Sequence, residues 1–193
     1  VWALAKDQWN NLLVGTDRGL SVHCAHEPFH SWSLSAITGR GDGNTFGTLL
    51  IDADGTTLWA GGDNGLISMQ YSADGWKASK WYRQGDPQWS ISHNRIRKLH
   101  RLSDGTVIAC TDHGLYIIDS QSSMPRNVLL TDGTGHYNAT WAYDIVEDRK
   151  GRCWVAAYAG GIFIIDSKRL LASQGYVKAD AHLGSTLIGV NVS

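Results

Sequence analysis

The sequence predicts an all-β fold, and three observations support this. A short segment recurs four times along the 193 residues, with a glycine before its last apolar run at positions 19, 65, 114 and 161. Those glycines are 46, 49 and 47 residues apart, a period typical of propellers and solenoids. Each copy holds three short apolar runs between tight turns and lacks the 3.6-residue periodicity of a helix. Four short antiparallel strands in each repeat make a propeller blade, so we expect a β-propeller.

Each strand can be assigned from its apolar run. The first strands are anchored by Val1 and Leu4, Phe46 and Leu49, Ile96 and Leu99, and Ala142 and Ile145. The second are expected over Leu12–Thr16, Leu58–Gly62, Val107–Thr111 and Cys153–Ala157. The third are expected over Leu20–His23, Leu66–Met69, Leu115–Ile118 and Ile162–Ile165, and the fourth over Phe29–Leu34, Trp76–Tyr82, Asn127–Leu130 and Gly175–Ala179. The best helical stretch, Lys168–Ser173, is one or two turns long.

Asp-Gly dipeptides between the first two runs, such as Asp54-Gly55 and Asp104-Gly105, predict hairpins with type I′ turns. The blades then cover roughly residues 1–45, 46–95, 96–141 and 142–185, and residues 186–193 resemble the first strand of a further blade. This register favours an open arc from a larger propeller, possibly seven-bladed or double. A compact four-bladed ring is the alternative.

Composition excludes several classes of protein. The formal net charge of −1 gives no electrostatic case for binding nucleic acid or an anionic membrane. No segment has the pattern of a signal peptide or the length of a membrane span. The three cysteines cannot form a complete disulfide framework. Cys110 and Cys153 fall at apolar or glycine positions of the repeat, so we expect both to be small buried residues.

The repeat resembles the two-component regulator propeller repeat, with a consensus near V-x-x-L-x-x-D-x-x-G-N-L-W-V-G-T-x-x-G-L. The first copy matches it at Val1, Leu4, Asp7, Asn10–Thr16 and Gly19-Leu20. The second matches at Leu49, Asp52, Gly55, Leu58–Gly61 and Gly65-Leu66, and the fourth at Ile145, Asp148, Gly151, Trp154-Val155 and Gly161-Ile162. The third keeps Ile96, Leu99, Gly105, Thr111 and Gly114-Leu115 but has Leu102 in place of the aspartate.

The resemblance implies an extracytoplasmic sensor domain of a bacterial hybrid two-component receptor. Such a domain would be periplasmic, would recognise an oligosaccharide and would signal to a histidine kinase through a homodimeric receptor. The kinase and the membrane-spanning parts would lie outside this segment, which would itself be neither an enzyme nor a cofactor protein. The alternatives are a propeller enzyme acting on glycans, such as a lyase or a glycosidase, and a scaffold that binds protein.

Some candidate motifs have simpler structural interpretations. Asp7, Asp52 and Asp148 recur before the first turn, where capping backbone amides is a simpler role than catalysis. His23, His26 and His30, with Cys24 among them, are spaced like zinc ligands, but a solvated loop is the simpler interpretation. The glycine-rich segment 39–44 lacks the lysine and the helix of a phosphate loop. Trp59 and Trp154 share a strand position and are expected in the core between blades.

The loops between blades and the second tight turns share one face of a propeller and carry many aromatic and polar residues. Aromatic rings stack on the apolar faces of sugars, while Asn, Asp, Arg and His meet the hydroxyl groups. Trp2, Asn94 and several charged residues also lie in these loops, although the position of Asn94 favours a hydrogen bond to the backbone. The predicted ligand-binding residues are Arg40, Asn64, Trp89, His93, Arg95, His113, His136, Tyr137, Trp141 and Tyr158. No catalytic or metal-binding residue is expected.

Overall fold

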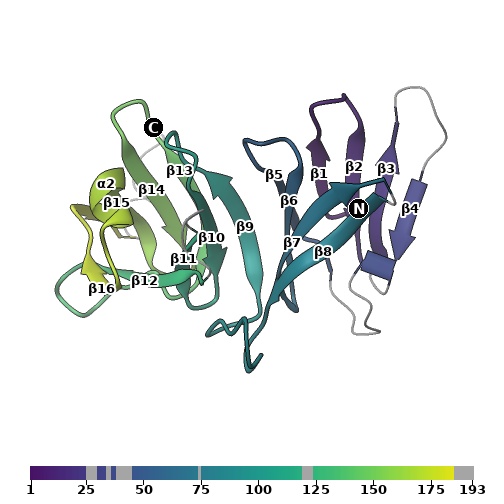
Figure 1. Cartoon of the computed structure of the whole chain (residues 1–193). Helices are drawn as coiled ribbons and strands as arrows, with labels where there is room; N and C mark the ends of the chain where they lie inside the picture. Colours follow the sequence, from purple (N-terminus) through teal and green to yellow (C-terminus); the bar gives the residue numbers. More distant parts are fainter. Residues whose placement is uncertain (25–29, 34–35, 38–44, 74, 119–123, 185–193) are drawn as a thin grey trace, which may run out of the picture. The chain divides into compact units, whose positions relative to one another are not determined.

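The computed structural model describes residues 1–24, 30–33, 36–37, 45–73, 75–118 and 124–184. The chain forms two compact units, Val1–Leu99 and His100–Ser193, and each is described by itself. The described residues form four sheets built of short strands (Figure 1). These sheets have the topology of propeller blades, so the predicted all-β propeller fold is confirmed.

The first unit holds two four-stranded antiparallel sheets in which the strands follow chain order. One sheet contains β1 (Ala3–Lys6), β2 (Leu12–Thr16), β3 (Gly19–His23) and β4 (His30–Ser33). The other contains β5 (Thr48–Ile51), β6 (Thr57–Gly62), β7 (Gly65–Ser72) and β8 (Gly75–Tyr82). All six residues of β6 are buried, because both faces of this strand are covered by protein.

The next sheet begins with β9 (Ile96–Arg101), the strand in which the division between the units falls. It continues with β10 (Val107–Thr111), β11 (Gly114–Ile118) and β12 (Arg126–Thr131). The last sheet contains β13 (Ala142–Glu147), β14 (Arg152–Ala157), β15 (Gly161–Asp166) and β17 (Ala181–Leu183). The expected short helix is α2 (Ser167–Leu171), whose first turn is capped by the Asp166 carboxylate.

The assignment of Gly175–Ala179 as the outer strand of the fourth blade is wrong. Its strand, β16 (Gly175–Lys178), pairs in parallel with β12 and forms the fifth strand of the preceding sheet. The guanidinium of Arg126 in β12 donates hydrogen bonds of 2.7 Å each to the carbonyls of Leu171 and Ser173. These bonds hold the end of α2 beside β12, so the chain passes the β12 edge before β17 completes the fourth blade.

The first turn has the same geometry in all four blades, but the prediction of type I′ turns is wrong. The turn at Asp52–Gly55 closes through a 2.9 Å hydrogen bond from the Gly55 amide to the Asp52 carbonyl. Gly55 has φ 68°, whereas Asp54 does not have a positive φ, and a type I′ turn needs positive φ at both central residues. Asn10, Gly105 and Gly151 occupy the same position, with φ of 70°, 93° and 71°.

The glycine of the second turn is required by the strand that passes over it. A Cβ atom at Gly65 would lie 2.2 Å from the carbonyl oxygen of Tyr82, in the outer strand of the same blade. The corresponding distances are 2.5 Å from Gly114 to the Val128 oxygen and 2.1 Å from Gly161 to the Leu183 oxygen. These glycines also have positive φ, so close packing and backbone conformation both select glycine at the position that marks the repeat.

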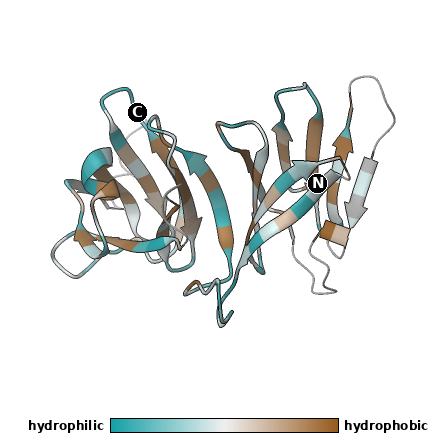
Figure 2. Ribbon diagram, in the orientation of Figure 1, coloured by the Kyte–Doolittle hydropathy of each residue, from teal (hydrophilic) through white to brown (hydrophobic). Residues whose placement is uncertain are grey.

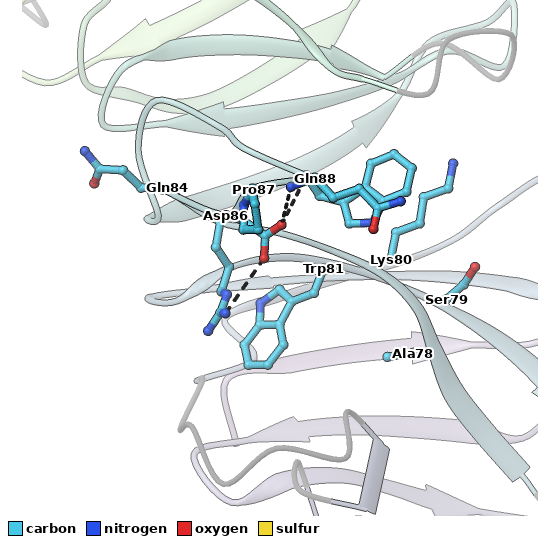
Figure 3. Close-up of a pocket in the computed structure, with 11 residues that line it drawn as sticks. Ala78, Ser79, Lys80, Trp81, Gln84, Asp86, Pro87 and Gln88 are labelled. Atoms are coloured by element: carbon cyan, nitrogen blue, oxygen red, sulfur yellow. Dashed lines mark hydrogen bonds and ion pairs between the residues drawn. The ribbon is translucent and has the colours of Figure 1, made fainter.

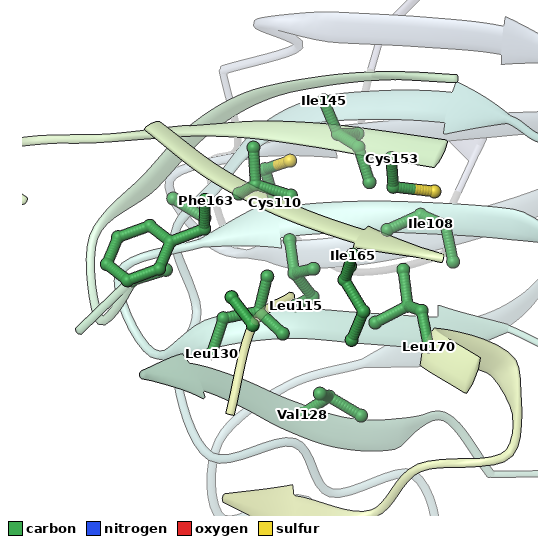
Figure 4. Packing of buried hydrophobic residues seen from close by; sticks show 14 of the residues in the cluster. Ile108, Cys110, Leu115, Val128, Leu130, Ile145, Cys153, Phe163, Ile165 and Leu170 are labelled. Carbon is green, nitrogen blue, oxygen red and sulfur yellow. The ribbon is translucent and has the colours of Figure 1, made fainter. Parts of the chain in front are cut away.

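Each unit has its own hydrophobic core. In the first unit, buried residues of β2, β3, β6 and β7 pack with Phe46 and Trp76. In the second unit, Ile108, Leu115, Phe163 and Ile165 are completely buried in one cluster (Figure 4). Brown apolar positions alternate with teal polar ones along several strands in Figure 2, as expected for a pleated strand with one face toward a core.

The cysteines and tryptophans of the repeat bear out most of the core prediction. Cys110 and Cys153 are fully buried in the second core, and burial, with nearby carboxylates, raises the pKa of the Cys153 thiol to about 12. Trp59 is 8% exposed, as expected for a core residue. Trp154 is only partly buried, so its core assignment is wrong. Strand alternation turns Cys153 and Val155 toward the core and Trp154 to the opposite face, where Val146 is 55% exposed.

Candidate functional site

The recurring aspartates hold the first turns together, as the sequence predicts. Asp7 accepts hydrogen bonds from the amides of Trp9 and Asn11 at 2.9 and 2.8 Å. Asp148 accepts from the amides of Lys150 and Arg152 at 2.9 and 3.1 Å. Each carboxylate thus accepts hydrogen bonds from the backbone of its own turn, as expected for a structural role.

The sequence did not reveal a second role for two of these aspartates. The indole N–H of Trp154 donates to Asp148 at 2.9 Å, and that of Trp59 donates to Asp52 at 3.1 Å. The hydrogen bond from Trp154 and those from Arg152 hold the pKa of Asp148 well below its usual range. The aspartate and the tryptophan of the repeat therefore act as a pair that ties the turn to the second strand.

The zinc interpretation has no support in the described residues. No group of three or more His, Cys, Asp and Glu side chains that could hold a metal ion occurs in the part of the chain that the structure describes. His26 and the segment 39–44 lie outside the described residues, and the His30 side chain is not described. Cys24, Cys110 and Cys153 are free thiols.

Three aromatic side chains of the second unit form an exposed group, here called the three-ring cluster: Trp141, Tyr143 and Tyr158. Their exposed fractions are 47%, 42% and 60%. The ring of Tyr158 lies between the other two, with centroid separations of 5.3 Å to Trp141 and 5.9 Å to Tyr143. Tyr158 and Tyr143 stack with an interplanar angle of 28°. The cluster therefore presents a connected aromatic surface to solvent.

Local backbone structure holds the three rings together. The amide of Tyr158 donates to the Trp141 carbonyl at 2.9 Å, which joins the start of β13 to the end of β14. The pairing of β13 with β14 shifts between Ala142 and Asp144, so Tyr143 is the extra residue of a β-bulge. A bulge re-aims side chains. The sequence predicted Trp141 and Tyr158 as ligand-binding residues but not Tyr143, because no sequence signal marks the bulge.

Other predicted residues of the second unit lie near different partners. The ring of Tyr137 lies 5.0 Å from that of His182, whose Nε2 is 2.6 Å from the Gly160 carbonyl oxygen. His182 also packs on the buried Phe163, at 4.5 Å between ring centroids, so it connects Tyr137 to the core. His113 lies in a turn and His136 in a bend, and both residues are exposed.

In the first unit, Trp89 lines a hollow of about 410 Å³ between β8 and the loop that follows it (Figure 3). We call this hollow the β8 pocket. Its side chains of interest are Lys80, Trp81, Arg83, Asp86 and Trp89. Asn64, His93 and Arg95 do not line it. Of these five residues, Trp89 was predicted from the sequence and the other four were not.

The remaining predicted residues of the first unit have structural partners. Arg95 pairs with Asp63 at 3.2 Å, and Nδ1 of His93 accepts the Arg95 amide at 3.1 Å. The Asn64 carbonyl accepts the indole N–H of Trp81 at 2.8 Å. Asn94 accepts the Gln84 amide at 2.6 Å, as expected for a backbone partner. Arg40 lies outside the described residues.

No described helix is long and apolar enough to cross a membrane. No protein-family model matches the sequence, and a search of curated proteins finds no match. The comparison with solved structures, by contrast, finds clear relatives for an all-β chain made of propeller blades.

The extracellular domain of the putative hybrid two-component system BT4673 from B. thetaiotaomicron is 30% identical over 94% of this chain, with a TM-score of 0.72. A second structure of the BT4673 extracellular domain, described as a putative one component system, is 29% identical over 96% of the chain, with a TM-score of 0.71. These matches confirm the resemblance to extracellular domains of two-component systems. The chain covers only 30% and 31% of those two structures.

Two less similar structures show the fold alone. The extracellular domain of the putative hybrid two component system BT3049 from B. thetaiotaomicron is 19% identical over 87% of this chain, which covers 23% of it, with a TM-score of 0.63. A putative gluconolactonase is 14% identical over 85% of this chain, which covers 59% of it, with a TM-score of 0.54. The two structures near 30% identity are thus described as extracellular domains of one- or two-component systems, and the putative gluconolactonase is similar only in fold.

Proposed function

We propose that this chain is part of a periplasmic, non-enzymatic sensor propeller that recognises an oligosaccharide. The resemblance to extracellular domains of two-component systems supports the sensor role. The three-ring cluster is the observation that carries the ligand class. Ligand binding would bias a dimeric receptor between two arrangements and so control a histidine kinase outside this segment.

The chemistry of the cluster suits a sugar. Pyranose rings present apolar C–H faces, and exposed aromatic rings bind such faces by stacking while the hydroxyl groups stay hydrated. The Trp141 and Tyr158 rings are about half or more exposed and pack against each other at 5.3 Å, and a hydrogen bond joins their backbones, so little ordering is needed on binding. Asp148, the recurring aspartate of this blade, is engaged by its own turn and by Trp154, which favours binding over hydrolysis.

Titration of the chain with a panel of neutral and acidic oligosaccharides, followed by tryptophan fluorescence and calorimetry, tests this proposal. We expect saturable binding of one glycan class without turnover. Replacing Trp141 or Tyr158 by alanine should weaken that binding about tenfold, because an aromatic ring that the ligand covers on binding contributes roughly 1–2 kcal/mol. The matched control is Trp9→Ala, which removes another exposed tryptophan (49%) that also contacts a tyrosine ring, Tyr71 at 5.5 Å.

Each other outcome contradicts part of the proposal. Release of shorter sugars from a bound glycan would identify an enzyme instead of a sensor. Absence of binding across the panel would remove the oligosaccharide from the proposal and favour a protein-binding scaffold. Equal losses in Trp9→Ala and Trp141→Ala would show that the three-ring cluster is not the site.

A further inference from the structure

Hydrogen bonds within the chain hold the frame of the β8 pocket. The loop that follows β8 closes on Arg83, the residue directly after the strand: the Arg83 amide donates to the Trp89 carbonyl at 3.0 Å, and the Ile91 amide donates to the Arg83 carbonyl at 3.2 Å. Oδ1 of Asp86 accepts the amides of Gln88 and Trp89 at 3.0 and 2.9 Å (Figure 3). Preorganised loops lose little entropy on binding, so this hollow is suited to a small ligand.

Two tryptophans line the pocket, and each carries a cation over its ring. The guanidinium carbon of Arg83 lies 4.4 Å from the centroid of Trp81, and Nζ of Lys80 lies 5.0 Å from that of Trp89. The indole N–H of Trp81 is anchored to the Asn64 carbonyl at 2.8 Å. The Trp89 ring meets Tyr82 edge to face at 5.7 Å. The aromatic walls are therefore fixed, and positive charge is placed directly on them.

The charge of the pocket is opposite to that of the whole chain. Lys80 and Arg83 contribute two positive charges, and Asp86 is the one carboxylate among its lining residues. Asp86 already accepts two backbone amides and lies 3.9 Å from Arg83. The pocket thus keeps a net positive charge, while the chain has a formal net charge of −1. A positive hollow favours an anionic ligand.

We propose that the β8 pocket is a subsite for an acidic sugar residue, one that carries a carboxylate or a sulfate group. Trp89, which is partly exposed, would contact the apolar face of the sugar, and Lys80 and Arg83 would bind its anionic group by charge-assisted hydrogen bonds. Trp81 is only 8% exposed, so its role would be to hold the Arg83 guanidinium in place. The exposed amides of Gln84 and Gln88, which also line the hollow, suit the hydroxyl groups. This inference rests on the proposed function and narrows it from oligosaccharides in general to acidic ones.

The test compares matched acidic and neutral probes on the intact 193-residue chain. The acidic probes are tetrasaccharides of galacturonate, of alginate, of hyaluronan and of chondroitin sulfate, and the neutral probes are galactose and glucose tetrasaccharides. We expect calorimetry to show binding of an acidic probe, with affinity that falls as salt is raised from 50 to 500 mM, values chosen to span about 14 to 4 Å of screening length.

Three variants locate the site. Lys80→Gln and Arg83→Gln remove one charge each and should weaken binding of the acidic probe about tenfold, as expected for loss of a charge-assisted hydrogen bond. Lys77→Gln is the matched control, because Lys77 lies on the same strand and does not line the pocket. Circular dichroism and thermal melting of every variant check that the fold is retained. If Arg83→Gln fails to fold, Lys80→Gln still tests the proposal.

The outcomes separate this inference from the proposed function. Binding of neutral probes alone, or acidic binding that Lys80→Gln weakens no more than Lys77→Gln does, overturns the acidic subsite and leaves the oligosaccharide sensor intact. No binding of any glycan overturns the proposed function, and the subsite with it. A selective loss in Lys80→Gln supports the subsite whether or not variants of the three-ring cluster also lose affinity.

Discussion

Replacing Gly114 by alanine should destabilise the protein much more than replacing Gly105 by alanine. The two glycines lie in the two hairpin turns of one blade and have similar backbone conformations, with φ of 81° and 93°. Their surroundings differ. A Cβ at Gly105 meets nothing within 4 Å, whereas a Cβ at Gly114 would lie 2.5 Å from the carbonyl oxygen of Val128 in β12. Comparing the two variants therefore separates the cost of the positive φ from the cost of the steric overlap with β12.

The magnitudes follow from these two terms. An L-residue with positive φ costs about 1–2 kcal/mol, and Gly105→Ala should lose only this. Gly114→Ala adds an overlap with backbone, well inside the 3.4 Å at which ordinary contact begins. Relieving this overlap requires a shift of β12, whose central residues are buried and which is paired on both edges. Overpacking of this kind costs roughly a further 1–3 kcal/mol. We therefore expect a total of about 2–5 kcal/mol for Gly114→Ala.

Urea unfolding of both variants, followed by tryptophan fluorescence, measures the difference in their stability. The midpoint urea concentration should fall while the slope of the free energy of unfolding against urea stays unchanged. For a chain of this size, each kcal/mol also lowers the melting temperature by roughly 2–4 °C. Equal losses in the two variants would refute the argument, because backbone conformation alone would then explain the glycine. A larger loss in Gly105→Ala would show that the first turn limits stability instead of the crossing strand.

Three further predictions concern single side chains. Trp154→Phe removes the indole donor to Asp148, so it should cost about 1 kcal/mol of stability and raise the pKa of Asp148. NMR titration would detect the change in pKa. An unchanged pKa would show that the hydrogen bonds from Arg152 lower the Asp148 pKa without help from Trp154. Hydrogen bonding, from Thr134 above all, lowers the pKa of Asp132 to about 2, and the pKa of Asp148 is lowered too. Both carboxylates therefore contribute stability above about pH 4 that is lost as the pH falls toward 2. Urea midpoints that stay constant over this pH range would contradict the assignment. The buried Cys153, with its pKa of about 12, should resist a thiol reagent at pH 8 until urea unfolds the chain. The half-buried Cys24 should react in the native state. Peptide mapping by mass spectrometry would show which of the two cysteines is labelled.

The strands could be predicted from the sequence because their pattern is local. Runs such as Leu12–Thr16 and Val107–Thr111 match the observed β2 and β10 residue for residue, and the turns fall where glycine or asparagine interrupts the apolar pattern. Asp7 and Asp148 could likewise be assigned to turns, because their partners lie within four residues along the chain. Hairpin structure depends on neighbours in sequence, so the sequence carries it.

The candidate sites could be predicted only in part. The predicted Trp141 and Tyr158 lie together in the three-ring cluster, but Tyr143 joins them through a bulge that no residue pattern marks. The β8 pocket combines Trp89, which was predicted, with Lys80 and Arg83, which were not. A ligand role for all of these residues remains a prediction.

The sequence by itself determined the all-β fold, the four-fold repeat and the glycines that mark it, because each is written in local periodicity. Only the tertiary structure decided that Gly175–Lys178 joins β12 in place of the fourth blade, that the face of β14 carrying Trp154 is left partly exposed, and that the loop after β8 brings Trp89 to Lys80. Each of these depends on which strand edges and loops meet after folding. Strand edges offer the same backbone donors and acceptors whatever their side chains, so contacts between distant segments leave little trace in the sequence.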